Sequence, residues 1–75
     1  MNNTSHFRLR SYSKTELALM YSPYSSPQTA LQCLSRWIKH CRPLMDELRS
    51  MGYNKFRHTL LRQEVEAIVR HLGEP

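Results

Sequence analysis

The chain has 75 residues, the length of one small domain, with 11 Lys and Arg against 6 Asp and Glu and a formal net charge of +5. The apolar content of 40% is too high for a disordered chain, and no run of about 18 apolar residues is present to span a membrane. A domain this small buries only about 60–65% of its unfolded surface, so it has little room for an enclosed substrate pocket. The positive charge therefore favours a polyanionic partner over a small substrate.

The polar N-terminal end of the chain leads into a short capped helix. Residues 1–6 are expected to be disordered, and residues 7–12 alternate as a weak strand or an extended arm. The segment Ser13-Lys-Thr-Glu16 forms a capping box, which starts a helix over residues 14–21. Pro23 ends this helix, because the residue before a proline avoids the helical conformation.

The second and third helices each begin at a proline. Ser26-Pro27 supplies an N-cap and the first helical residue, and a helix is predicted over residues 27–41 after a five-residue turn. The third helix is predicted over residues 43–51, with Gly52 directly after its end. The apolar stripe of the second helix consists of Leu31, Leu34, Ile38 and Cys41.

The last third of the chain predicts a short β-hairpin and a fourth helix. Residues 53–60 are aromatic, basic and tolerant of β-structure, with a turn at Asn54-Lys55. The fourth helix is predicted over residues 62–72, and its start is poorly capped because Leu61 stands where a Ser or Thr would serve. The outer face of this helix is expected to carry Glu64, Glu66 and Arg70.

The two cysteines, Cys33 and Cys41, are expected to be free thiols. On one helix they are separated by about 12 Å of rise, far beyond disulfide reach. Free thiols fit a cytoplasmic protein, and the first twelve residues lack the apolar segment of a secretory signal. His40 is expected to be a surface histidine beside a core thiol, because no metal-binding spacing of Cys or His is present. No metal or other cofactor is expected.

The placement of the charges distinguishes the second helix. At 100° per residue, the face opposite its apolar stripe carries no acid and consists of Gln28, Gln32, Ser35, Arg36 and Lys39. A solvated helix face is the ordinary alternative, but such faces commonly mix the two signs. The acid-free face therefore favours nucleic acid, with Arg36 suited to guanine and Gln28 or Gln32 to adenine.

Two further basic clusters lie outside this helix. In the expected hairpin, Phe56 either stacks on a base or packs into the core, and core packing is favoured because a small domain needs its aromatic residues inside. Arg8 and Arg10 either follow a phosphate backbone or solvate an edge strand. The candidate DNA-binding residues are Gln28, Gln32, Ser35, Arg36, Lys39, Arg42, Lys55, Arg57 and Arg62.

Together the elements predict a mainly α fold in one domain over residues 1–75. The expected architecture is helix-turn-helix or winged-helix-like, with about four helices and a short β-hairpin. The resulting hypothesis is a DNA-binding protein, a transcriptional or mobile-element accessory factor, that reads duplex DNA with the second helix and a basic wing. A homodimer or a protein partner would extend the contact, since one short helix reaches few bases. The five-residue turn is longer than the usual 3–4 residues.

Two sets of motifs carry resemblances to known families. Ser13-Lys-Thr-Glu-Leu-Ala18 and Arg36-Trp37-Ile38 resemble segments of the MerR and excisionase type of DNA-binding domain, which implies a recognition helix. Residues 7–75 more closely resemble a family of short uncharacterised proteins from Bacteroides-type bacteria, a domain of unknown function that implies no activity. That likeness rests on Tyr12-x-Lys14-x-Glu16-Leu17-Ala18-x-x-Tyr21, Pro27-x-x-Ala30-Leu31, Trp37-Ile38, Gly52-Tyr53 and Leu72-Gly73-Glu74-Pro75. Unlike the MerR pattern, an extra helix separates the recognition helix from the wing.

Three other function classes stay open. A protein-interaction module is the main alternative, with Trp37, Tyr24 and Met45 as anchors, although Trp37 borders the apolar stripe and is favoured as a core residue. RNA binding comes next, but the chain lacks aromatic-rich strands of the kind that bind RNA. An enzyme is the weakest alternative, because nothing resembles a nucleophile elbow, a phosphate-binding loop or a carboxylate pair.

Overall fold

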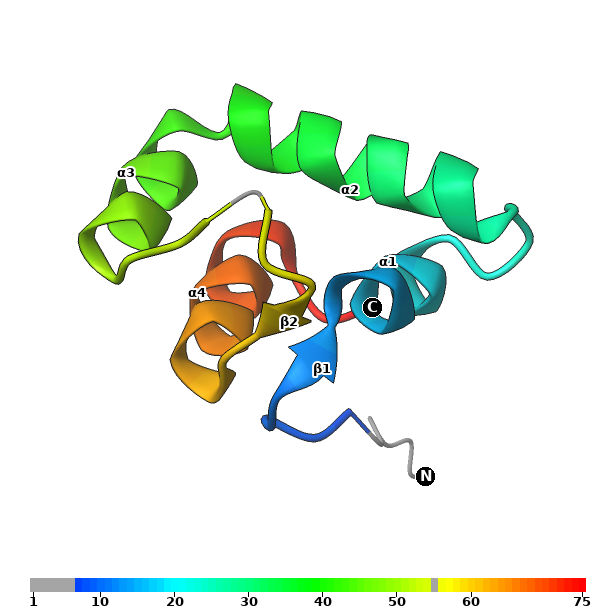
Figure 1. Ribbon diagram of the computed structural model, residues 1–75, viewed down its shortest axis with the longest axis horizontal. Coiled ribbons are helices and arrows are strands. Elements are labelled where there is room, and N and C mark those ends of the chain that lie inside the picture. The colour runs from blue at the N-terminus through cyan, green and yellow to red at the C-terminus, as the bar shows by residue number, and fades with distance from the viewer. Residues whose placement is uncertain (1–6, 55) are drawn as a thin grey trace.

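The computed structural model describes residues 7–54 and 56–75 (Figure 1). The elements in chain order are β1 (Tyr12–Ser13), α1 (Lys14–Tyr21), α2 (Pro27–His40), α3 (Arg42–Ser50), β2 (Thr59–Leu60) and α4 (Arg62–Leu72). The mainly helical class, with four helices and one antiparallel strand pair, is confirmed, and each helix boundary lies within one residue of its predicted position. The disorder expected for residues 1–6 falls outside the described residues.

The caps predicted from sequence start the first two helices. The Ser13 Oγ accepts a hydrogen bond from the Glu16 N–H at 3.0 Å, and the Glu16 carboxylate accepts one from the Ser13 N–H at 3.3 Å. At α2, the Ser26 Oγ accepts from the Thr29 N–H at 3.2 Å, with Pro27 in the first turn. These bonds satisfy N–H groups that a helix start leaves without partners.

The strand pair joins segments that are distant in the sequence. Tyr12 pairs with Leu60 and Ser13 with Thr59, in antiparallel register. The expected location of the hairpin therefore needs correction: residues 53–60 contribute one strand, and its partner comes from the N-terminal arm. A two-residue strand has no detectable period, so long-range packing decides the pairing.

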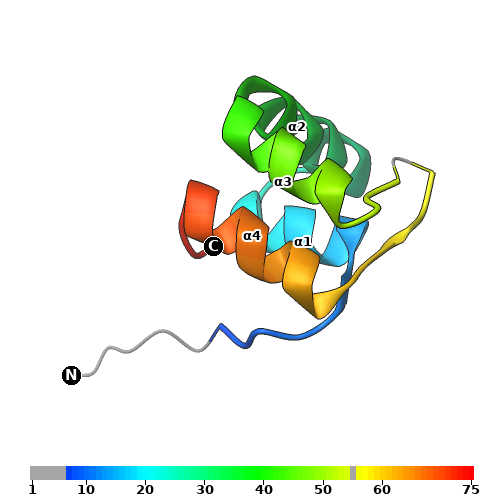
Figure 2. The same ribbon diagram turned by 90° about the vertical axis from the view of Figure 1, so that its left-hand side faces the viewer.

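The core lies between α2 and the helices beneath it. In both views α2 runs along one side of the molecule, while the N-terminal arm lies on the opposite side (Figures 1 and 2). In the described part of the chain, no helix is both long and apolar enough to cross a membrane. The buried apolar residues are Tyr12, Leu17, Ala18, Ala30, Leu34, Ile38, Leu44, Leu48, Leu60, Val65, Ala67 and Ile68.

Candidate nucleic-acid interface

An open groove of about 670 Å³ lies between α2 and the segment that joins α3 to β2. We call it the α2 groove. Its lining includes four Lys or Arg residues and two His, and none of its described lining residues is acidic. The lining residues are Lys14, Thr15, Leu31, Gln32, Ser35, Arg36, Lys39, His40, Tyr53, Arg57 and His58.

The polar face of α2 supplies one wall of the groove. Because the opposite face of α2 buries Ala30, Leu34 and Ile38, the acid-free face is turned to solvent. Of the five residues predicted on that face, Gln28 is exposed in the first turn but does not line the groove. The four that line it are Gln32, Ser35, Arg36 and Lys39.

Lys14 lies in the opposite wall, a position that the sequence did not indicate. Its Nζ donates to the Asn54 carbonyl at 2.8 Å and lies 4.6 Å from the centre of the Tyr53 ring. Burial lowers the pKa of Lys14, and the positive charge of Arg57 lowers it further, against an opposing effect of Glu64. Lys14 and Arg57 are therefore neighbouring cations, and the Glu64 carboxylate offsets part of their positive charge.

Arg57 lines the groove, and its guanidinium is held in place by hydrogen bonds to Thr59 and to the buried Glu64. Its Nε donates to the Thr59 carbonyl at 2.9 Å, and its Nη2 pairs with the Glu64 carboxylate. Glu64 is fully buried, so its expected place on the outer face of α4 is wrong. The physical reason is that Glu64 accepts the Leu61 N–H at 2.8 Å and also pairs with Arg57, so the buried carboxylate has partners for both oxygens.

The aromatic residue beside Arg57 also departs from expectation. The Phe56 side chain is 77% exposed, so the prediction that it packs into the core is wrong. The Asn54 Oδ1 accepts the Phe56 N–H at 2.8 Å, a bond between residues close in the chain. An Asx turn of this kind fixes a loop locally and does not require a buried side chain.

The comparisons with known proteins place the chain in a family. A domain described as "Domain of unknown function (DUF4248)" matches residues 8–75. The chain belongs to this DUF4248 family. No curated protein and no solved structure gives a significant match. The family membership supplies no activity, so the geometry of the groove has to carry the functional argument.

Two other predicted site residues of this DUF4248 domain, Arg42 and Arg62, do not line the α2 groove. Arg42 lines a second depression of about 460 Å³, together with an acid, Asp46. Arg62 is exposed at the start of α4 and lines neither depression. Lys55 lies outside the described residues.

The N-terminal arm, whose sequence includes Arg8 and Arg10, runs on the side of the domain away from α2 (Figure 2). The guanidinium of Arg10 stacks 3.9 Å above the Tyr12 ring and pairs with Glu16 at 3.5 Å. The Tyr12 hydroxyl donates to the Arg8 carbonyl at 2.8 Å, and its ring stacks on Phe7. The arm is therefore packed onto its own strand and does not extend toward the α2 groove.

The candidate protein-binding anchors differ in exposure. Trp37 is 41% exposed and makes an edge contact with Tyr21 at 6.1 Å, so it borders the core and is not part of it. Tyr24 is fully exposed in the turn between α1 and α2. Met45 is partly buried against the core.

Proposed function

We propose that this DUF4248 domain binds duplex DNA, with α2 facing the major groove and the α3–β2 segment against the phosphate backbone. The observation that carries the proposal is the lining of the α2 groove. Four cations, Lys14, Arg36, Lys39 and Arg57, converge there without an acidic lining residue in the described part of the chain. A surface of one sign attracts a polyanion and raises its local concentration.

The residues of the α2 groove divide into two roles. Gln32 and Arg36 are exposed on a helix and present hydrogen-bond donors suited to the edges of adenine and guanine. Lys39 is placed for phosphate contact, and Lys14 and Arg57 are fixed by internal hydrogen bonds at the opposite wall. Such fixed donors reduce the entropy that binding would otherwise cost.

In this proposal the α3–β2 segment serves as the wing of the binding surface. The extra helix α3 does not separate this segment from α2, because Tyr53 and Arg57 line the same groove as Arg36. The helix order and the returning segment support a transcriptional or mobile-element accessory role.

The decisive experiment is a fluorescence-anisotropy titration with mixed-sequence duplexes over a series of salt concentrations. The three phosphate contacts of Lys14, Lys39 and Arg57 predict a slope of log affinity against log salt of about −2.7. An absence of binding at low salt, or a slope near zero, would contradict the proposal. Single-stranded DNA and duplex RNA in competition separate the duplex DNA proposal from other nucleic acids.

A pair of charge-matched variants locates the binding surface. Arg36→Gln with Lys39→Gln removes two positive charges from the α2 groove, and Arg8→Gln with Arg10→Gln removes two from the arm on the other side. We expect the first pair to reduce the magnitude of the salt slope by about 0.9, through the phosphate contact of Lys39, and the second to leave the slope nearly unchanged. Equal effects of the two pairs would mean that net charge alone attracts the DNA.

The second candidate function, a protein-interaction module, is favoured by the exposure of Tyr24 and Trp37. Aromatic residues of this kind commonly anchor protein interfaces. Under this alternative, Trp37→Ala would abolish binding to a purified protein partner while the groove variants leave that binding unchanged.

A further inference from the structure

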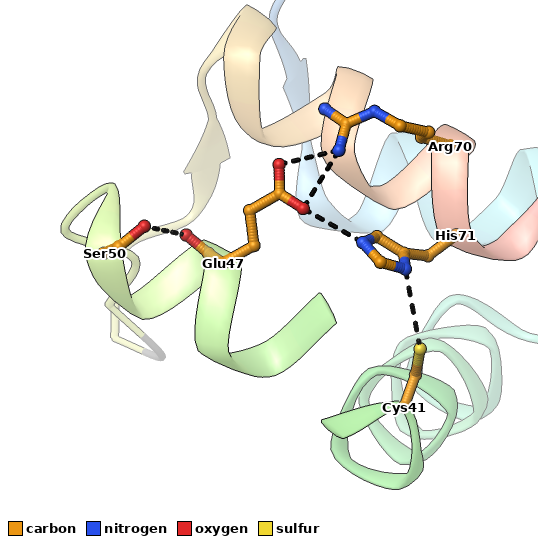
Figure 3. Close-up of polar contacts among 5 residues, drawn as sticks. All are labelled: Cys41, Glu47, Ser50, Arg70 and His71. Atoms are coloured by element: carbon orange, nitrogen blue, oxygen red, sulfur yellow. Dashed lines mark hydrogen bonds and ion pairs between the residues drawn. The ribbon is translucent and has the colours of Figure 1, made fainter. Parts of the chain in front are cut away.

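A cluster of polar and reactive side chains, none of which lines the α2 groove, lies at the junction of α2 and α3 (Figure 3). Cys41 is the single residue between these helices, and its Sγ lies 4.0 Å from Nδ1 of His71 near the end of α4. On the other side of the ring, Nε2 of His71 lies 2.9 Å from Oε1 of Glu47 in α3. Three segments of the chain thus place the His71 imidazole between the Cys41 thiol and the Glu47 carboxylate.

The carboxylate determines which nitrogen of His71 faces the thiol as a base. The Nη1 of Arg70 donates to both oxygens of Glu47, at 3.0 and 2.8 Å. The hydrogen bond from Arg70, followed by that from His71, lowers the pKa of Glu47, so the carboxylate is ionised at neutral pH. An ionised carboxylate only accepts, so Nε2 carries the proton. In the neutral ring, Nδ1 then has a lone pair directed toward the Cys41 Sγ.

The arrangement is that of a thiol beside an oriented base, which is how cysteine nucleophiles are activated. A metal site does not explain this arrangement, because Nδ1 of His71 lies beside Cys41 and Nε2 lies beside Glu47. The three side chains therefore cannot bind one ion together. Within residues 7–54 and 56–75, no group of three metal-ligating side chains is present. Cys41 is only partly buried, so a small reagent can reach it.

We propose that Cys41 is a site of thiol–disulfide exchange, with an anionic low-molecular-weight disulfide as its substrate. Such exchange needs only a nucleophile and a proton acceptor, since the leaving thiolate is stable without further support. Lys39, His40 and Arg42 lie beside Cys41 in the chain, and their positive or ionisable groups favour an anionic reagent. This inference is independent of the proposed DNA binding.

The reaction balances without a further oxidant. The Cys41 thiol passes its proton to Nδ1 of His71, and the Sγ attacks one sulfur of the disulfide. A new S–S bond forms between Cys41 and that sulfur while the old S–S bond breaks. The departing thiolate takes the proton from His71 and leaves as a small thiol. The products are one mixed disulfide at Cys41 and one free thiol, so the number of disulfide bonds is unchanged.

The test compares the two cysteines of the folded protein. Cys33→Ser leaves Cys41 as the only thiol, and Cys41→Ser leaves Cys33. With oxidised glutathione at pH 7, followed by intact-protein mass spectrometry, we expect Cys41 to form its mixed disulfide at least about ten-fold faster than Cys33. In urea-unfolded protein the two rates should become similar, since the cluster is lost.

The role of His71 is tested by His71→Gln in the Cys33→Ser background. We expect this change to reduce the rate at Cys41 about ten-fold while the thermal melt stays cooperative, and Arg70→Gln to reduce it less. A Cys41 rate equal in folded and unfolded protein would overturn the proposal even if His71→Gln does not fold. A rate unaffected by His71→Gln would overturn the role of the base. Rapid reaction with neutral iodoacetamide but not with glutathione disulfide would overturn the substrate class.

Discussion

Glu64 links the core of the domain to the wall of the α2 groove. Its side chain is fully buried, and its oxygens accept from the Leu61 N–H and from the guanidinium of Arg57. A buried carboxylate that loses its cation is strongly destabilising, because its charge has neither water nor a partner. Arg57 therefore stabilises the fold in addition to lining the α2 groove.

The first prediction concerns this ion pair. Arg57→Ala should reduce the free energy of unfolding by about 2 kcal/mol, less than for a wholly buried pair since Arg57 is partly exposed. Adding Glu64→Gln should recover part of that loss, because the neutral amide does not need a cation. Urea unfolding of the two single variants and the double variant measures the interaction energy between Arg57 and Glu64. Strictly additive losses of stability would contradict the predicted interaction.

The second prediction concerns Tyr21, whose hydroxyl donates to the Gly73 carbonyl. Burial, followed by the negative charge of Glu74, raises the pKa of Tyr21 to about 12 from its ordinary value of 10.0. The unfolded chain therefore releases this proton first. The stability that Tyr21 contributes is fully present below pH 10 and is lost as the pH rises toward about 12.

The measurement is urea unfolding of the wild type and Tyr21→Phe at pH 8 and at pH 11. The wild type should lose more stability between these values than the variant does. Lys14, whose pKa is lowered, and Tyr53, whose pKa is raised, act equally in both proteins, so the comparison isolates Tyr21. Parallel losses in the two proteins would show that Tyr21 is not responsible.

At the scale of the elements, α4 begins without a side-chain cap. Leu61 occupies the N-cap with an extended backbone, and its side chain is 41% exposed and has no oxygen to accept an N–H. We predict that Leu61→Ser stabilises the domain by about 0.5–1 kcal/mol, while Ser26→Ala at α2 costs about 1 kcal/mol. Thermal melts measure both changes, and destabilisation by Leu61→Ser would mean that the leucine packing outweighs the cap.

The helices were predictable from sequence because their signals are local. Ser13, Ser26 and Pro27 act on N–H groups within one turn, so their effect needs no knowledge of the fold. The strand pair was not predictable in its location, since three helices separate Tyr12 from Leu60 in the chain. Glu64 was misplaced for the same reason: a helical period marks it as outer, but its partner Arg57 comes from another segment.

For the whole molecule, four Lys or Arg residues line the α2 groove, and Arg8 and Arg10 belong to the N-terminal arm on the side away from α2. The acid-free face of α2 was predictable because a helix fixes which side chains share a face. The place of Lys14 in the same groove was not predictable, because it depends on the contact of Lys14 with Asn54 in the distant α3–β2 segment. We predict that duplex DNA shifts the NMR amide signals of Gln32, Arg36 and His58 and leaves those of Arg8 and Arg10 almost unchanged. Larger shifts in the arm would place the DNA on the other side of the domain.

The pairing of β1 with β2 also bears on the kinetics of folding. The two strands close a chain loop that contains α1, α2 and α3, and closing so long a loop costs conformational entropy before it gains contacts. We therefore expect the pair to form late, after the helices have docked. Contacts that form after the transition state slow unfolding without speeding folding. The lifetime of the folded domain then depends on its smallest element, the two residue pairs that hold the arm to the start of α4.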